Sequence, residues 1–126
     1  MKTKFSSSWV KSKQPRKQRK YRHNAPLHIK QKFIHTHLSK ELHKKYKKKS
    51  LGLRKGDSIK VVRGQFKNKS GKVNEVSIKK TLVYVSGIEI AKKGGTKTRY
   101  PIHPSNLIIT EVNIDDKKRN KILRRK

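Results

Sequence analysis

The stretch "LRKGDSIKVVRGQFKNKSGKVNEV", Leu53 to Val76, decides how we expect the chain to fold. Within it, Ile59 and Val61 alternate with polar neighbours, which is the period of a half-buried strand. A basic loop follows, and the apolar positions then change phase between Val73 and Val76. Because such a change indicates a bulge or a sharp bend, the stretch predicts two short strands, the second one bent, joined by a basic loop.

The loop does not match the phosphate-binding loop of nucleotidases. That motif runs Gly, four residues, Gly, Lys and then Ser or Thr. Here Gly71 and Lys72 are followed by Val73, and Phe66 stands where the first glycine is required. We therefore expect the loop to bind a ligand rather than to catalyse a reaction.

Further short strands are predicted up to residue 110. The segments are Thr81 to Val85, Gly87 to Ala91, Thr96 to Ile102 and Asn106 to Thr110, with a tight turn at Lys79-Lys80 and another at Gly94-Gly95. This spacing favours a mainly β fold, a small antiparallel barrel near the lower size limit for independent folding. The residues expected to form most of its core are Ile59, Val61, Val73, Val76, Leu82, Val83, Val85, Ile102, Leu107 and Ile109.

The segments flanking these strands are strongly basic. Residues 11–23 show no apolar period and are expected to form an arm that is disordered when free. Two short helices are predicted, one over 25–35 with Asn24 as its N-cap and one over 39–50 capped by Ser39, both clamping an RNA or protein surface. Asp115-Asp116 begin a short C-terminal helix or tail. The predicted organisation is thus an arm (1–23), two helices (24–50), a barrel (51–112) and a tail (113–126).

The composition points to a polyanionic partner. The 126 residues carry 37 Lys and Arg against 7 Asp and Glu, a formal charge of +30, and only 30% are hydrophobic. Nucleic acid would remove the self-repulsion and order the basic segments. No apolar run approaches the ~18 residues of a membrane span, no secretory signal opens the chain, and no basic helix with a broad apolar face suggests a membrane surface. The absence of cysteine excludes disulfides and suits a reducing cytosol.

No catalytic, metal or cofactor site is expected. The seven acids are scattered, and the six histidines, including His35, His37 and His43, match no common zinc spacing. Neither an enzyme activity nor a small-molecule substrate is therefore predicted. Trp9, Tyr21 and Tyr46 lie among cations and could stack on bases.

Motifs along the chain resemble one family. The stretch Leu53 to Val76 resembles the KOW motif of ribosomal proteins and transcription elongation factors, with Gly71 at the position of its glycine. The flanking segments "KQPRKQRK" (Lys13 to Lys20), "NAPLHIKQK" (Asn24 to Lys32), "LSKELHKKY" (Leu38 to Tyr46) and "YPIHPSNL" (Tyr100 to Leu107) resemble the large-subunit ribosomal protein of the twenty-fourth universal family, called L twenty-six in eukaryotes. They look archaeal in type. Residues 1–12 match no pattern of the family.

This resemblance implies an SH3-like barrel and a structural role in the large ribosomal subunit. It also implies binding to large-subunit rRNA near its 5′ domain, an early place in subunit assembly, and a position near the mouth of the peptide exit tunnel. The expected location is the cytoplasm, within the ribosome, with neighbouring large-subunit proteins as further partners.

The candidate rRNA-binding residues are mostly cations of the arm, the helices and the basic loop. Gly64 and Gly71 are expected to adopt positive φ and bring the loop backbone close to RNA, and Phe66 is expected either to contact a base or sugar or to pack within the loop. The full set is Lys13, Arg16, Lys17, Arg19, Lys20, Arg22, His28, Lys30, Lys32, Lys44, Lys45, Arg54, Arg63, Gly64, Gln65, Phe66, Lys67, Lys69, Gly71, Lys72, His103 and Ser105.

Three alternatives remain open from the sequence. A KOW module of an elongation factor would belong to a larger chain with a different N-terminal domain. A DNA-compacting protein would account for the charge but not for "NAPLHIKQK" and "YPIHPSNL". An RNA-modifying enzyme would need an acid, metal or cofactor site, for which there is no sequence signal.

Overall fold

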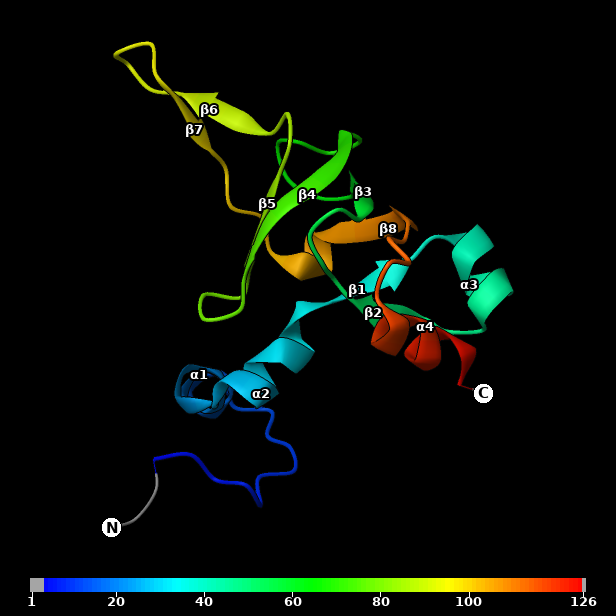
Figure 1. Ribbon diagram of the computed structural model, residues 1–126. Coiled ribbons are helices and arrows are strands. Elements are labelled where there is room, and N and C mark those ends of the chain that lie inside the picture. Colours follow the sequence, from blue (N-terminus) through cyan, green and yellow to red (C-terminus); the bar gives the residue numbers. More distant parts are fainter. Residues whose placement is uncertain (1–3, 126) are drawn as a thin grey trace.

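The structure is a computed structural model that describes residues 4–125, and it shows a small β-rich domain flanked by helices (Figure 1). One six-stranded sheet has the order β2-β1-β8-β3-β4-β5, and β6 and β7 form a separate hairpin. The strands are β1 His35–Leu38, β2 Ser50–Gly52, β3 Ser58–Val61, β4 Ser70–Ser77, β5 Leu82–Val85, β6 Glu89–Ala91, β7 Lys97–Arg99 and β8 Leu107–Glu111. The helices are α1 Pro15–Asn24, α2 Leu27–Lys30, α3 Lys40–Tyr46 and α4 Lys117–Arg124, with 3-10 turns η1 Gln31–Ile34 and η2 Pro104–Asn106.

The strand, loop and strand predicted from Leu53 to Val76 are present as β3 and β4. They pair antiparallel, with Ile59 opposite Gly71. The predicted bend is confirmed, because the register of β4 against β5 shifts between Val73 and Glu75. This shift lets Val73 enter the core while the strand continues into the β4-β5 hairpin.

The N-terminal half supplies strands that the sequence did not reveal. β1 lies within the range expected to hold only helices, and it pairs antiparallel with β2 and parallel with β8. The expectation of a purely antiparallel sheet was therefore wrong. The hydrogen-bonded order also ends at β2 and β5, so the described strands form an open sheet rather than a closed barrel.

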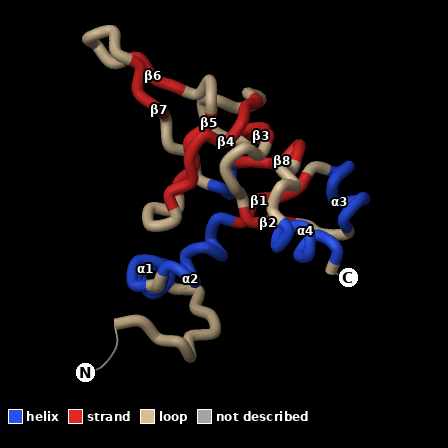
Figure 2. Tube along the Cα trace, viewed as in Figure 1, coloured by secondary structure: helices blue, strands red, loops and turns tan. Residues whose placement is uncertain are grey.

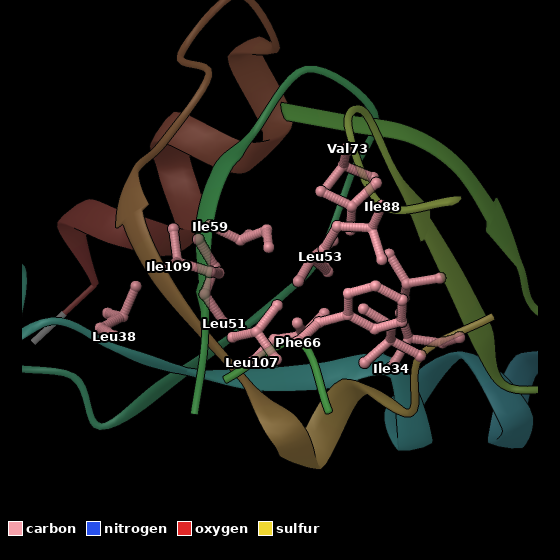
Figure 3. Packing of buried hydrophobic residues seen from close by; sticks show 14 of the residues in the cluster. Ile34, Leu38, Leu51, Leu53, Ile59, Phe66, Val73, Ile88, Leu107 and Ile109 are labelled. Carbon is pink, nitrogen blue, oxygen red and sulfur yellow. The ribbon is translucent and has the colours of Figure 1, made fainter. Parts of the chain in front are cut away.

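The hydrophobic core lies between the curved sheet and the segments that cross it (Figure 3). Eight of the ten predicted core residues are buried, whereas Val76 and Leu82 are only partly so. Apart from Ile88, the buried members not predicted for the core come from segments outside the predicted strands. They are Ala25, Ile34, Leu38, Leu51, Leu53, Phe66, Ile88 and Leu123.

The helices follow the sequence only in part. The capping of α3 by Ser39 is confirmed, since its Oγ accepts from the Leu42 N–H at 3.3 Å, and Asp116 caps α4 through the Lys118 N–H at 2.7 Å. The short helix predicted over 25–35 is present only in part, as α2 and η1 over residues 27–34, and its predicted cap is wrong, because Asn24 ends α1 instead of capping α2.

The arm predicted to be disordered contains α1, in which Pro15 opens a run of good helix formers. Residues 1–3 of the predicted arm and residue 126 of the predicted tail lie outside the described residues.

Candidate nucleic-acid interface

The basic loop between β3 and β4 is held in one shape by its own backbone. The Asn68 N–H donates to the Val61 carbonyl and the Val61 N–H donates to the Lys69 carbonyl, both at 2.8 Å. Two residues of the loop, Gly64 at φ 95° and Asn68 at φ 69°, adopt left-handed conformations. The positive φ predicted for Gly64 is confirmed, and the resulting loop is closed rather than extended.

Phe66 anchors this loop in the core. Its side chain is buried, and its ring centroid lies 5.0 Å from that of Tyr100. Of the two roles expected for Phe66, the structure shows the packing one, with the ring against Tyr100. The burial of one apolar side chain fixes the loop on the sheet, so the polar residues around it face solvent.

Gly71 has a different role from the predicted one. It lies within β4, and its φ is not in the left-handed region. A Cβ atom at this position would lie 2.5 Å from the Ser86 carbonyl oxygen and 2.9 Å from Val85 Cγ1. The predicted positive φ is therefore wrong, and the glycine is needed because the chain after β5 passes over it.

The four cations of the loop region remain available to a ligand. Arg63, Lys67, Lys69 and Lys72 are all exposed, and within residues 4–125 none of them forms an ion pair. The Lys69 ammonium lies 5.2 Å from the Phe66 ring centroid, a cation–π distance that orders the lysine without neutralising it. These charges surround a loop of fixed shape, which is the arrangement that phosphate groups bind.

A second predicted element, the turn around η2, lies beside this loop. Together they line a cavity of about 270 Å³ that includes Arg63, Gln65, Phe66, His103 and Asn106. The structure thus brings together candidate residues that are about 40 positions apart in the sequence. Ser105 is exposed on the same turn.

The imidazole of His103 connects this turn to α1. Its Nε2 lies 3.3 Å from Arg22 Nη2, and its Nδ1 lies 2.8 Å from Ser105 Oγ and 3.3 Å from the Ser105 backbone nitrogen, whose N–H is a donor. Burial and the nearby Arg22 guanidinium lower the pKa of His103 below its usual 6.5. The ring is therefore neutral near pH 7, with Nδ1 accepting from the Ser105 N–H and Nε2 directed at Arg22.

The remaining candidate residues differ in whether they already contact another side chain of the protein. Arg22 lies 5.4 Å from the Phe33 ring centroid in addition to its contact with His103, so it supports the docking of α1. Arg54 forms an ion pair with Asp116 at the start of α4. Most of the others are exposed or partly exposed on α1, α2, η1 and α3, namely Arg16, Lys17, Arg19, Lys20, His28, Lys30, Lys32, Lys44 and Lys45; Lys13, also exposed, precedes α1.

The aromatic residues proposed as base-stacking groups lie in two places. Tyr46 packs against the core, with the Lys45 ammonium 5.4 Å from its ring centroid. Trp9 and Tyr21 instead stack on each other, with ring centroids 4.2 Å apart. This second group belongs to the N-terminal part of the molecule, below the sheet in Figure 2.

A buried ion pair was missed by the sequence reasoning. Arg119 of α4 donates from Nη1 and Nη2 to the two carboxylate oxygens of Asp57, each at 2.6 Å, and both side chains are buried. The same carboxylate accepts the backbone N–H groups of Arg54 at 2.9 Å and Asn113 at 3.0 Å. Since 62 residues separate the partners, no local pattern could have indicated the pair.

Neither a metal site nor a membrane-spanning helix is found in the part of the chain that the structure describes. No group of three or more His, Asp or Glu side chains there is placed to hold a metal ion. His43 instead contacts the Lys48 carbonyl at 2.8 Å. Over residues 4–125, no helix is both long and apolar enough to cross a bilayer.

Comparison with known proteins agrees with the motifs. Residues 12–126 match the family of ribosomal proteins described as L26 in eukaryotes and L24 in archaea. The large ribosomal subunit protein uL24 of Methanothrix thermoacetophila is 49% identical over 114 residues, which cover 90% of this chain and 98% of that protein. The protein of the same name from Methanosphaera stadtmanae is 47% identical over 115 residues, covering 91% and 98%. The chain therefore belongs to the ribosomal protein family called L26 in eukaryotes and L24 in archaea, and it is of the archaeal type.

Proposed function

We propose that this member of the family binds large-subunit rRNA as a structural component of the large ribosomal subunit in the cytoplasm. The observation that carries the proposal is the basic loop, in which four exposed cations surround a backbone fixed by hydrogen bonds and by the buried Phe66 ring. A fixed array of cations recognises the shape and phosphate spacing of folded RNA without reading its bases.

The rest of the interface is proposed to extend from this loop. The cavity beside the loop reaches the turn at His103 and Asn106, and Arg22 joins that turn to α1. Lysines and arginines of α1 would then contact further phosphates, with α2, η1 and α3 forming the clamps predicted from the sequence. We propose the four regions 1–23, 24–50, 51–112 and 113–126 as functional divisions, and the bent strands as an SH3-like KOW fold that is open at one edge.

An early role in assembly and a position near the peptide exit tunnel are part of the same proposal. A free chain with a net charge of +30 and only seven acids is destabilised by repulsion between its own cations. Binding the 5′ region of the rRNA would neutralise these cations as soon as that region is transcribed. The test is to purify ribosomes at rising salt, follow the chain by mass spectrometry, and crosslink it to RNA. Stoichiometric retention with crosslinks in the 5′ region supports the proposal, whereas recovery with polymerase or DNA contradicts it.

The contribution of the loop is tested by charge reversal. Changing Lys67 and Lys69 to Glu should weaken binding to an rRNA fragment and lower the salt dependence, because each phosphate contact adds about 0.7 to 0.9 to the log-log slope. The matched control changes Lys92 and Lys93, two exposed lysines of the β6-β7 hairpin connection, by the same charge. An equal loss in both variants would show that net charge, and not this loop, determines binding.

A further inference from the structure

The segment 4–12 folds back along helix α1. At one end, Asn24 Nδ2 donates to the Lys4 carbonyl at 3.4 Å, and at the other end Gln18 Nε2 donates to the Ser12 carbonyl at 2.7 Å. The segment and the helix therefore run in opposite directions, side by side (Figure 1). The family match covers residues 12–126, so residues 4–11 of this segment lie outside it.

Aromatic rings join the added segment to the helix. The indole of Trp9 is stacked on the Tyr21 ring, with centroids 4.2 Å apart and planes at 21°. Phe5 approaches the same tyrosine at 4.9 Å, and Phe33 lies at 6.4 Å from it on the η1 side. Since Tyr21 covers one face of the indole, only the other face and the edges of Trp9 can meet a ligand.

A basic pocket lies between the segment and the helix. Its volume is about 410 Å³, and it is lined by aromatic rings that include Trp9 and Tyr21 and by four lysines, Lys4, Lys11, Lys17 and Lys20. Lys17, Lys20 and Tyr21 have the spacing of one helix face, so α1 presents two ammonium groups beside an aromatic ring. No Asp or Glu occurs in the first 40 residues to neutralise these charges.

We propose that this pocket binds one unpaired nucleotide of RNA, with the base against Trp9 and the neighbouring phosphates on the lysines. Proteins bind single-stranded nucleic acid with aromatic rings that stack on the bases and with nearby cations that contact the phosphates. A base within a double helix has no free face to offer, so the occupant is a residue outside the paired regions. The volume suits one nucleotide rather than a helix. This inference rests on the proposed function, because it presumes RNA as the partner, but it concerns a different surface from the basic loop.

The sole tryptophan makes the test specific. Trp9 is the only tryptophan of the chain, so its fluorescence reports on this pocket even if an oligonucleotide also binds elsewhere on the basic surface. The full-length protein is titrated with an eight-nucleotide oligoadenylate and with an abasic ribose-phosphate octamer of the same charge. Saturable quenching by the oligoadenylate, and little or none by the abasic octamer, is expected.

Two variants complete the test. Replacing both Lys17 and Lys20 by Ala retains the fluorophore and should weaken the affinity for oligoadenylate, measured by the quenching of Trp9, by about tenfold. The same change at Lys92 and Lys93 should have a much smaller effect. Trp9→Leu should weaken binding of labelled oligoadenylate roughly five- to a hundredfold if stacking contributes as it does elsewhere. Equal quenching by the two octamers, or none by either, would overturn the nucleotide pocket.

Binding of a 5′ fragment of large-subunit rRNA, measured in parallel, separates this inference from the proposed function. If the fragment binds but oligoadenylate does not quench Trp9, the pocket is refuted and the proposed function stands. If the fragment itself fails to bind, the proposed function fails, whatever the octamers do.

Discussion

Two residues, Gly71 and Arg119, show how a single position can depend on a distant part of the chain. Gly71 lies under the segment that follows β5, where the Ser86 carbonyl oxygen occupies the space of a side chain. Arg119 reaches from α4 to Asp57, just before β3, and completes the hydrogen bonding of a buried carboxylate. Both contacts hold the β3-β4 unit that carries the basic loop.

Changing Gly71 to Ala should destabilise the protein by about 1–3 kcal/mol, because the added methyl group must push a backbone carbonyl aside. The measurement is the free energy of unfolding in urea, followed by circular dichroism. Gly94→Ala is the matched control, since Gly94 has open space around its Cβ position and no positive φ. Equal stabilities of the two variants would contradict the proposed packing role of Gly71.

Changing Arg119 to Met should cost about 3–5 kcal/mol, because the Asp57 carboxylate would remain buried without its cation. Arg124→Met, on the exposed side of the same helix, should have little effect on stability. Thermal unfolding of both variants provides the comparison. A midpoint for Arg119→Met close to that of the control would show that the ion pair adds no net stability over an apolar side chain.

At the scale of elements, the docking of α1 on the η2 turn depends on one neutral imidazole. His103 contacts Arg22 of α1 and Ser105 of its own turn. Protonation would place an imidazolium against a guanidinium, which repels it. The basic arm and the turn are therefore joined by a contact that weakens on acidification.

NMR titration of His103 should give a pKa below 6.5, owing first to burial and second to Arg22. The folded state then binds fewer protons than the unfolded state between the lowered pKa and 6.5, so stability rises with pH through this window and falls as the pH drops below 6.5. Arg22→Gln should raise the pKa of His103 towards 6.5. A pKa at or above 6.5 in the unchanged protein would argue against the contact.

The elements also show where sequence patterns succeed. β3, β4, β5 and β8 were predicted because each has at least two apolar residues in a period that local sequence can show. β1 was missed because its sequence, "HTHL", buries Thr36 and Leu38 between two neighbouring strands. Buried threonine gives no apolar signal, and only the pairing with β2 and β8 makes this segment a strand.

At the scale of the whole molecule, charge opposes folding. A net charge of +30 on 126 residues repels itself, and the described residues form only three ion pairs, of which one is buried. The hydrophobic core is small, and the helices around the sheet (Figure 2) contribute only a few residues to it, among them Leu123 of α4.

Raising the salt concentration from about 50 to 500 mM should therefore raise the thermal unfolding midpoint of the free protein, because counterions screen the repulsion between exposed cations. The rise should be smaller in a variant with Lys92, Lys93 and Lys97 changed to Gln, all of them exposed. Differential scanning calorimetry measures both. A midpoint that falls with salt would mean that attractive surface pairs outweigh the repulsion.

By itself, the sequence determined the family, the basic loop, most strands of the sheet and the expectation of a polyanionic partner. Those features depend on composition, on short periodicities and on motifs, all of which are local. Only the tertiary structure decided that Phe66 packs inward, that Gly71 makes room for Ser86, that Asp57 binds Arg119 and that residues 4–12 form a pocket with α1. These contacts join residues that are distant in the chain, and their energies depend on burial and distance, which no local pattern contains.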